Sequence, residues 1–164
     1  MFKVAVVTVS DKGSRGERAD ASGAVLAEMV RAQGWEVAET RIVSDDLEAV
    51  VETLIELCDR PLQLVLTTGG TGFSPRDNTP EATMQVVERL VPGLSEAMRH
   101  ETARVTPRAY LSRGVCGIRK RTLIVNLPGS PKAVRECLEV ILPILPHGLE
   151  ILAGAAGECA RERE

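Results

Sequence analysis

Short apolar segments alternate with helical patterns along the first half of this chain, and each apolar segment ends in polar or glycine residues. The clearest of them, from Gln63 to Thr68, is a β-branched run typical of a buried strand. It leads directly into Gly69-Gly70-Thr71-Gly72, and a helical pattern begins at Thr79-Pro80-Glu81. Glycine backbones adopt positive φ and let a ligand approach their N–H groups, and a helix N-terminus favours an anion. The sequence therefore predicts a strand, a loop that can hold a phosphate, and a helix.

The glycines alone leave a second interpretation open. No Gly-Lys-Ser/Thr follows at the spacing of a Walker A loop, and the G-x-G-x-x-G pattern of dinucleotide-binding domains is missing. Gly-Gly-Thr-Gly can therefore also be no more than a tight turn between a strand and a helix. The remainder of the chain has to decide between the two.

The rest of the chain continues the alternation of strands and helices, which predicts an α/β fold with a mostly parallel sheet and right-handed crossovers. We expect one domain over residues 1–164, with a frayed tail over residues 155–164. Residues 105–118 are ambiguous and suggest a short helix, a loop and an edge strand. The expected strands are Lys3–Ser10, Glu36–Val43, Gln63–Thr68 and Arg121–Leu127. The expected helices are Ala21–Gln33, Leu47–Cys58, Thr79–Val91, Leu94–Ala103, one that opens at Ser130 and one from Pro146 to Ala153.

Composition narrows the classes of function. A formal charge of −3 and an aromatic content of 2% argue against a nucleic-acid binder, which needs a basic surface and stacking platforms. Without a leader pattern or an apolar run of ~18 residues, we expect a cytoplasmic protein that does not enter a membrane. The cysteines form no C-x-x-C pair, so we expect reduced thiols and no zinc site. They are Cys58, Cys116, Cys137 and Cys159.

Four of the expected strands end in polar or glycine-rich residues at the same relative position. Because the carboxyl ends of parallel strands meet at one edge of a sheet, these loops predict a ligand-binding cleft at that edge. The four strand ends are Ser10-Asp11, Ser44-Asp45, residues 68–72 and residues 126–130.

Three carboxylates, those of Asp11, Asp45 and Asp77, are expected to face this cleft. The glycine loop and the turn at Ser130 can each offer backbone N–H groups to a phosphate, and Lys132 adds a positive charge. Carboxylates repel phosphates unless a cation lies between them, and Mg²⁺ is the usual bridge. The sequence therefore predicts magnesium-dependent handling of a nucleotide, which relies on positioning and charge neutralisation.

Helix and turn capping is the alternative role for these polar side chains. Asp11 and Asp45 are each explained as well by capping as by ligand binding. Asp46 is the expected cap of the second predicted helix, because it stands just before that helix begins. Thr79 and Ser130 have the side chains and the positions of N-caps for two later helices.

Two long motifs, residues 67–83 and residues 123–132, resemble the signature of the molybdopterin adenylyltransferases. This family comprises the MogA/MoaB group and the G domains of gephyrin. Shorter matches lie at residues 8–11, 20–23, 112–113 and 116–119, so that the resemblance covers nearly the whole chain from Val4 to about Leu152. It implies a three-layer αβα fold with a Rossmann-like central sheet, the molybdenum cofactor biosynthesis fold. It also implies a homotrimer or a hexamer.

The reaction that the resemblance implies is the magnesium-dependent transfer of AMP from ATP to the terminal phosphate of molybdopterin, which releases pyrophosphate. The product then passes to a molybdenum-inserting, MoeA-like partner protein. Asp45 and Asp77 match the two aspartates that this family associates with catalysis and with the metal. The residues implied to bind the nucleotide or the pterin are Ser10, Asp11, Thr68, Gly69, Gly70, Thr71, Gly72, Ser112, Arg113, Asn126, Pro128, Gly129, Ser130 and Lys132.

A second function fits the same residues. The chain can instead be a molybdopterin-binding or scaffold protein of the MoaB type, which holds the pterin without turnover. Asp45 and Asp77 favour the enzyme, because a binder gains nothing from two carboxylates that face a phosphate. Ala21 stands where some relatives have a basic residue, which leaves an anion contact at that position open.

Overall fold

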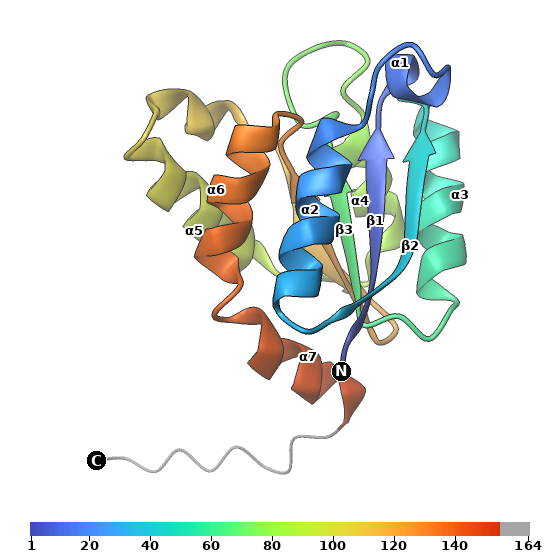
Figure 1. Cartoon of the computed structure of the whole chain (residues 1–164), viewed down its shortest axis with the longest axis vertical. Coiled ribbons are helices and arrows are strands. Elements are labelled where there is room, and N and C mark those ends of the chain that lie inside the picture. The colour runs from blue at the N-terminus through green and yellow to red at the C-terminus, as the bar shows by residue number, and fades with distance from the viewer. Residues whose placement is uncertain (155–164) are drawn as a thin grey trace.

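A six-stranded sheet runs through residues 1–154, the part of the chain that this computed structural model describes (Figure 1). Its strands are β1 (Lys3–Val9), β2 (Glu36–Val43), β3 (Leu64–Thr68), β4 (Arg89–Leu90), β5 (Cys116–Arg119) and β6 (Thr122–Leu127). The order across the sheet is β2-β1-β3-β6-β5-β4. Strands β2, β1, β3 and β6 are parallel, whereas β5 and β4 join in antiparallel pairs. The predicted mostly parallel α/β sheet is therefore confirmed.

Helices cover both faces of this sheet and complete a three-layer αβα fold. Helices α2 and α6 lie in front of the sheet in Figure 1, with α5 to their left. Helices α3 and α4 pack on the opposite face of the sheet, and α3 is seen at the right of β2. The helices are α1 (Asp11–Ser14), α2 (Ala21–Ala32), α3 (Leu47–Cys58), α4 (Thr79–Val86), α5 (Pro92–Ala103), α6 (Pro131–Ile141), α7 (Leu145–Ala153) and the short 3-10 helix η1 (Pro107–Leu111).

Strand β1 shows why the sheet is covered on both sides. Val4 and Val6 pack into the core beneath α2 and α6, whereas Ala5 and Val7 pack into the core beneath α3 and α4. Side chains of a strand alternate between the two faces, so a continuous apolar run serves both cores. The predicted central strand is therefore confirmed.

The predicted helix from Thr79 to Val91 is wrong at its C-terminal end. Helix α4 ends at Val86, and Val87 is already extended. The N–H of Glu88 donates to the carbonyl of Ile118 at 2.8 Å, and the two residues of β4 then pair with β5. Strand pairing thus overrides a pattern that would have continued the helix. β5 consequently lies inside the sheet, and β4 rather than β5 forms its edge.

The cysteines that the structure describes are Cys58, Cys116 and Cys137, and each is a buried free thiol. Burial raises the pKa of each thiol to about 11, so these side chains are unreactive near neutral pH. Cys159 and the predicted frayed tail lie outside the described residues. Within residues 1–154, no helix has the length and apolar character needed to cross a bilayer.

Candidate functional site

Two adjoining hollows lie at the edge of the sheet where the parallel strands end. The polar pocket, about 630 Å³, is lined by residues such as Ser10, Asp45 and Thr68. The apolar pocket, about 480 Å³, extends toward α5 and α6 and includes Met98 and Cys137. The two pockets share four lining residues, Gly70, Asp77, Gly129 and Ser130. The cleft therefore lies at the predicted edge, and its shared wall combines the glycine loop, one carboxylate and the turn before α6.

The glycine loop has a backbone that only glycine adopts without strain. Gly69 and Gly70 have φ values of +96° and +65°. A Cβ at Gly69 would lie 2.4 Å from the carbonyl oxygen of Val9, and one at Gly70 would lie 2.3 Å from Oγ1 of Thr79. The two glycines therefore bring β3 close to its neighbours and leave no side chain between the loop and a ligand.

Hydrogen bonds tie the glycine loop to the turn before α6. The hydroxyl of Thr68 donates to the carbonyl of Pro128 at 2.7 Å, and the N–H of Gly69 donates to the carbonyl of Leu127 at 3.2 Å. Thr79 belongs to the first turn of α4 and is not its cap, because its hydroxyl donates to the carbonyl of Gly69 at 2.9 Å. These bonds hold the shared wall of the two pockets in one geometry.

Ser130 caps α6 as predicted. Its hydroxyl accepts from the N–H of Ala133 at 3.2 Å, and Pro131 occupies the first helical position. Ser10 plays the same part for α1, where it accepts from the N–H of Gly13 at 3.0 Å. Both serines also line the polar pocket, so that capping and ligand contact are compatible at these positions.

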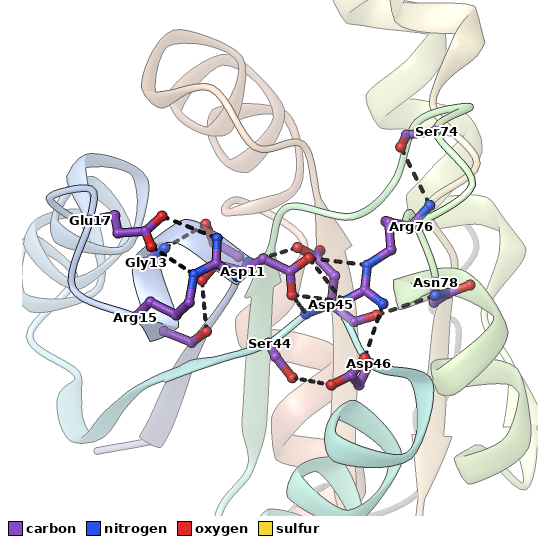
Figure 2. Close-up of polar contacts among 12 residues, drawn as sticks. Asp11, Gly13, Arg15, Glu17, Ser44, Asp45, Asp46, Ser74, Arg76 and Asn78 are labelled. Carbon is purple, nitrogen blue, oxygen red and sulfur yellow. Dashed lines mark hydrogen bonds and ion pairs between the residues drawn. The ribbon is translucent and has the colours of Figure 1, made fainter.

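An acidic cluster joins the loops after β1 and β2 (Figure 2). The N–H of Asp11 donates to Oδ2 of Asp45 at 2.8 Å, and the N–H of Asp45 donates to Oδ1 of Asp11 at 3.0 Å. Burial raises the pKa of Asp45 from its usual value, and the charges of Asp11 and Asp77 raise it further. Asp45 and Asp77 are therefore close enough to interact, and both line the polar pocket.

Arg76 was not selected from the sequence, although it stands beside Asp77 in the long motif. Its guanidinium donates to both carboxylate oxygens of Asp11, at 2.8 and 2.9 Å, and to Asp46 at 3.0 Å. These hydrogen bonds lower the pKa of Asp11. Asp11 is thus occupied by Arg76 and does not line either pocket, contrary to our expectation.

Asp46 is not the side-chain cap that the sequence predicted. It stands at the N-cap of α3, but its carboxylate makes no capping hydrogen bond. Instead it accepts from the hydroxyl of Ser44 at 3.1 Å and from Arg76. The cation that faces it competes for the carboxylate more strongly than backbone N–H groups do.

Arg113 and Lys132, both expected in the cleft, line neither pocket. Arg113 donates to the carbonyls of Gly72 and Asp77, each at 2.7 Å, and pairs with Glu81. The side chain of Lys132 is 79% exposed, and its Nζ lies 3.8 Å from Glu136. Arg113 therefore braces the glycine loop from behind. The predicted residues Thr71, Gly72, Ser112, Asn126 and Pro128 do line the apolar pocket.

Asn126 has a structural task as well. Its amide donates to the hydroxyls of Thr67 and Thr83 at 3.0 and 2.9 Å, and its oxygen accepts from the N–H of Val115 at 3.2 Å. The side chain thereby joins β6 to β3, α4 and the segment before β5. It is 2% exposed, so the contact it can offer a ligand is small.

Replacement of Arg113 by lysine is expected to loosen the glycine loop. The single nitrogen of a lysine cannot occupy both positions from which Nε reaches the carbonyl of Gly72 and Nη2 reaches that of Asp77. Loss of a hydrogen bond from a charged group costs about 1–3 kcal/mol. Thermal unfolding should show a lower melting temperature, and equilibrium binding should show weaker binding of ligands in both pockets. Arg104→Lys is the matched control, because Arg104 is 70% exposed and pairs only with Glu101 among the described residues. Equal melting temperatures for the two variants would contradict the bracing role.

Three residues that line the pockets were not predicted from the sequence. Asp20 lines the polar pocket, caps α2 through the N–H of Gly23 at 2.8 Å and accepts from the hydroxyl of Thr8 at 2.8 Å. Arg99 and Glu136 line the apolar pocket from α5 and α6. Asp20 could have been found because it opens a helix after a polar loop, whereas Arg99 and Glu136 carry no local signal.

No group of three or more His, Cys, Asp or Glu side chains that could hold a metal is found within residues 1–154. Asp45 and Asp77 are two carboxylates beside a loop suited to phosphate. This number matches a magnesium site that takes its remaining ligands from substrate phosphates and water.

Known proteins with similar sequences identify the family of this chain. A family model described as a probable molybdopterin binding domain matches residues 5–147. A molybdopterin adenylyltransferase of Helicobacter pylori (strain J99) is 40% identical over 154 residues, which cover 92% of this chain and 88% of that protein. A molybdopterin adenylyltransferase of Escherichia coli (strain K12) is 38% identical over 177 residues, which cover 98% and 90%.

Solved structures agree with these relatives. The crystal structure of the molybdopterin biosynthesis enzyme MoaB from Thermus thermophilus is similar to this chain with a TM-score of 0.89 and 52% sequence identity. The match covers 94% of this chain and 98% of that one. The family model extends over every residue that lines either pocket. The chain therefore belongs to the MogA/MoaB family of molybdopterin-binding proteins, which serves molybdenum cofactor biosynthesis.

Proposed function

We propose that this protein is a molybdopterin adenylyltransferase that transfers AMP from ATP to the terminal phosphate of molybdopterin and releases pyrophosphate. One observation carries the proposal: the two pockets adjoin at Asp77 and the glycine loop, with Asp45 next to them. A transfer between two phosphorylated substrates needs both phosphates at one place, close to groups that can balance their charge. The names of the relatives in Helicobacter pylori and Escherichia coli support the same activity.

The character of the two pockets supports an assignment of the substrates. The polar pocket, with its hydroxyls, backbone N–H groups and carboxylates, suits the phosphates and ribose of ATP. The apolar pocket, with Met98, Leu111 and Cys137 among its lining residues, suits the pterin. The terminal phosphate of molybdopterin then lies at Gly70 and Gly129, where it faces the α-phosphate of ATP.

Asp45 and Asp77 would hold Mg²⁺ in this proposal. Burial raises the pKa of Asp45, and the charges of Asp11 and Asp77 raise it too because neighbouring negative charges repel, a repulsion that a bound cation would relieve. Carboxylate oxygens are the ligands that Mg²⁺ prefers. When bound, the cation neutralises negative charge on the phosphate oxygens.

The side chains of the site position and orient the substrates. The carboxylate of Asp45 is fixed by the N–H of Asp11, and that of Asp77 accepts from the N–H of Ser74 at 2.9 Å. Backbone N–H groups of the glycine loop can donate hydrogen bonds to phosphate oxygens. No activated nucleophile is required from the protein, because the phosphate of molybdopterin attacks.

A second candidate function is molybdopterin binding without turnover. The solved structure from Thermus thermophilus, 52% identical to this chain, carries the name MoaB, and the MoaB type was the alternative that the sequence left open. Asp45 and Asp77 are the residues that favour the enzyme over the binder.

The assembly and the partner belong to the same proposal. We infer a homotrimer or a hexamer, as the resemblance to the family implies. The adenylylated product would be delivered to a molybdenum-inserting, MoeA-like protein. Since the reaction consumes ATP, we place it in the cytoplasm.

Pyrophosphate release from ATP and Mg²⁺ is the direct test of the proposed reaction. We expect release by the wild-type protein only when molybdopterin is present, and a fall of roughly a hundredfold in Asp77→Asn through loss of a charge that faces the phosphates. The asparagine oxygen can still accept a hydrogen bond from the N–H of Ser74, so the melting temperature of Asp77→Asn should equal that of the wild type.

Asp59→Asn is the matched control for this experiment, because Asp59 is an exposed carboxylate at the C-terminus of α3, where it pairs with Lys120. It should release pyrophosphate at the wild-type rate. Absence of release by the wild-type protein despite measurable binding of molybdopterin would favour the binding protein. Full activity of Asp77→Asn would remove Asp77 from the reaction.

A further inference from the structure

The apolar pocket contains one carboxylate that the proposed transfer does not use. Glu136 lines this pocket from α6, and its side chain is only 25% exposed. Ser130, Ala133 and Cys137 line the same pocket, so Glu136 shares one face of the helix with them. A half-buried carboxylate among apolar side chains requires a partner that donates hydrogen bonds.

The charged groups around Glu136 leave its oxygens available to a ligand. Its one ion pair among the described residues joins it to Lys132 at 3.8 Å, beyond hydrogen-bond length, and the Lys132 side chain is 79% exposed. Arg99, on the facing helix α5, donates through Nη1 to the carbonyl of Gly114 at 2.9 Å. Arg108, which also lines the pocket, is exposed. Glu136 is therefore an acceptor whose hydrogen bonds are unfilled by side chains of residues 1–154.

Helix geometry sets the distance between Glu136 and the phosphate end of the cleft. Ser130, in the wall that both pockets share, precedes Glu136 by six residues, and a rise of about 1.5 Å per residue separates the two by roughly 9 Å along the axis. A ligand that reaches both ends must carry a phosphate at one end and hydrogen-bond donors at the other. A ring system between them would lie against Met98 and Cys137.

Carboxylates pair best with two parallel N–H donors on one planar edge. A 2-amino-4-oxopteridine offers such an edge through its 2-amino group and its N3–H. Adenine does not, because its amino group stands next to a ring nitrogen that accepts hydrogen bonds. A carboxylate at this position therefore favours a pterin over the base of ATP. It would direct the pterin to the apolar pocket and leave the polar pocket to ATP.

We propose that Glu136 is a specificity-determining residue, whose carboxylate accepts two hydrogen bonds from the 2-amino and N3–H groups of the pterin. This inference rests on the proposed function and deepens it, because it names the group that recognises molybdopterin. The amide of a glutamine at this position would present one acceptor and one donor and would match only one of the two N–H groups.

Steady-state pyrophosphate release by Glu136→Gln tests the proposal. The KM for molybdopterin should rise about tenfold to a hundredfold, as expected for loss of a charged hydrogen bond, while the KM for ATP stays within about twofold. Glu139→Gln is the matched control, because it makes the same change on the exposed side of the same helix. It should leave both KM values unchanged. An unchanged KM for molybdopterin in Glu136→Gln overturns the proposal.

Direct binding of two small probes separates recognition from packing and from turnover. Free pterin has the 2-amino group, and lumazine, the 2,4-dioxo analogue, lacks it; both are fluorescent. Wild-type protein should bind pterin more tightly than lumazine, and Glu136→Gln should lose affinity for pterin while it keeps its affinity for lumazine. Equal losses for both probes, or equal affinities in the wild-type protein, overturn the assignment. Absence of pyrophosphate release by every variant would contradict the adenylyltransferase. If Glu136→Gln still lost its affinity for pterin, Glu136 would be the residue that binds the pterin in a binding protein.

Discussion

Replacement of Asp45 by asparagine is expected to reduce pyrophosphate release by roughly a hundredfold or more and, at neutral pH, to leave the protein as stable as before or more stable. The loss of activity follows from removal of a charge beside the phosphates. The effect on stability has the opposite sign because burial raises the pKa of this carboxyl, so its ionised form is disfavoured in the folded protein. The asparagine oxygen can still accept from the N–H of Asp11.

The pH dependence provides a check on this sign. A carboxyl whose pKa is raised by folding costs stability once the pH exceeds that folded value, and the cost is absent below the ordinary value of 3.8, where it is protonated in both states. In EDTA, the melting temperature of Asp45→Asn should therefore be higher than that of the wild type at pH 7. The two melting temperatures should become equal below about pH 4. Asp46→Asn, the adjacent exposed acid, should keep most of the activity. A lower melting temperature for Asp45→Asn at pH 7 would contradict the argument.

Replacement of Gly69 by alanine is expected to have the largest effect on stability. The φ of +96° strains an alanine, and its Cβ would lie 2.4 Å from the carbonyl oxygen of Val9, a backbone atom that cannot rotate away. Strain and overpacking together cost about 3 kcal/mol or more. For a chain of this size the melting temperature should fall by roughly 10 °C. Binding of ATP should weaken too, because the loop that is proposed to face its phosphates must shift.

Gly34→Ala is the control that separates backbone strain from the steric clash of the added Cβ. Gly34 has a φ of +72°, and nothing lies within 4 Å of the Cβ that an alanine would add. This variant should lose only about 1 kcal/mol. Urea unfolding of both variants gives the comparison. Equal losses would show that the close approach of β3 to Val9 contributes nothing.

The sequence was sufficient for the sheet and for the edge at which the two pockets lie. Strand β2 and helix α3 have the predicted bounds, and in α3 the residues at helical spacing, such as Val50, Leu54 and Leu57, are the buried ones. The predicted C-terminal end of helix α4 was wrong. Val86, Val87 and Leu90 continue a helical pattern, but strand pairing with β5 overrides it. A long-range strand partner leaves no local signal.

The site was harder to predict at the level of single side chains. The glycines and Asp77 could be chosen because loop chemistry marks them. Arg76 could not be placed, because an exposed arginine on a loop can reach several acids, and the fold alone brings Asp11 and Asp46 to it. Glu136 and Glu139 look alike in the sequence, and only the packing of α6 turns one of them toward the pocket.

The wall shared by the two pockets means that their ligands cannot bind independently. A ligand that reaches the shared wall from either pocket contacts Gly70 and Asp77, so its binding changes the free energy of binding in the other pocket. Thermodynamic linkage makes this effect reciprocal: whatever factor molybdopterin applies to the dissociation constant of ATP, ATP applies to that of molybdopterin. Two phosphates brought to one wall repel each other, which makes the cooperativity negative, and a cation between them reverses its sign. In the proposed reaction, the magnesium concentration therefore sets the sign and the size of this coupling, and not the order in which the two substrates bind.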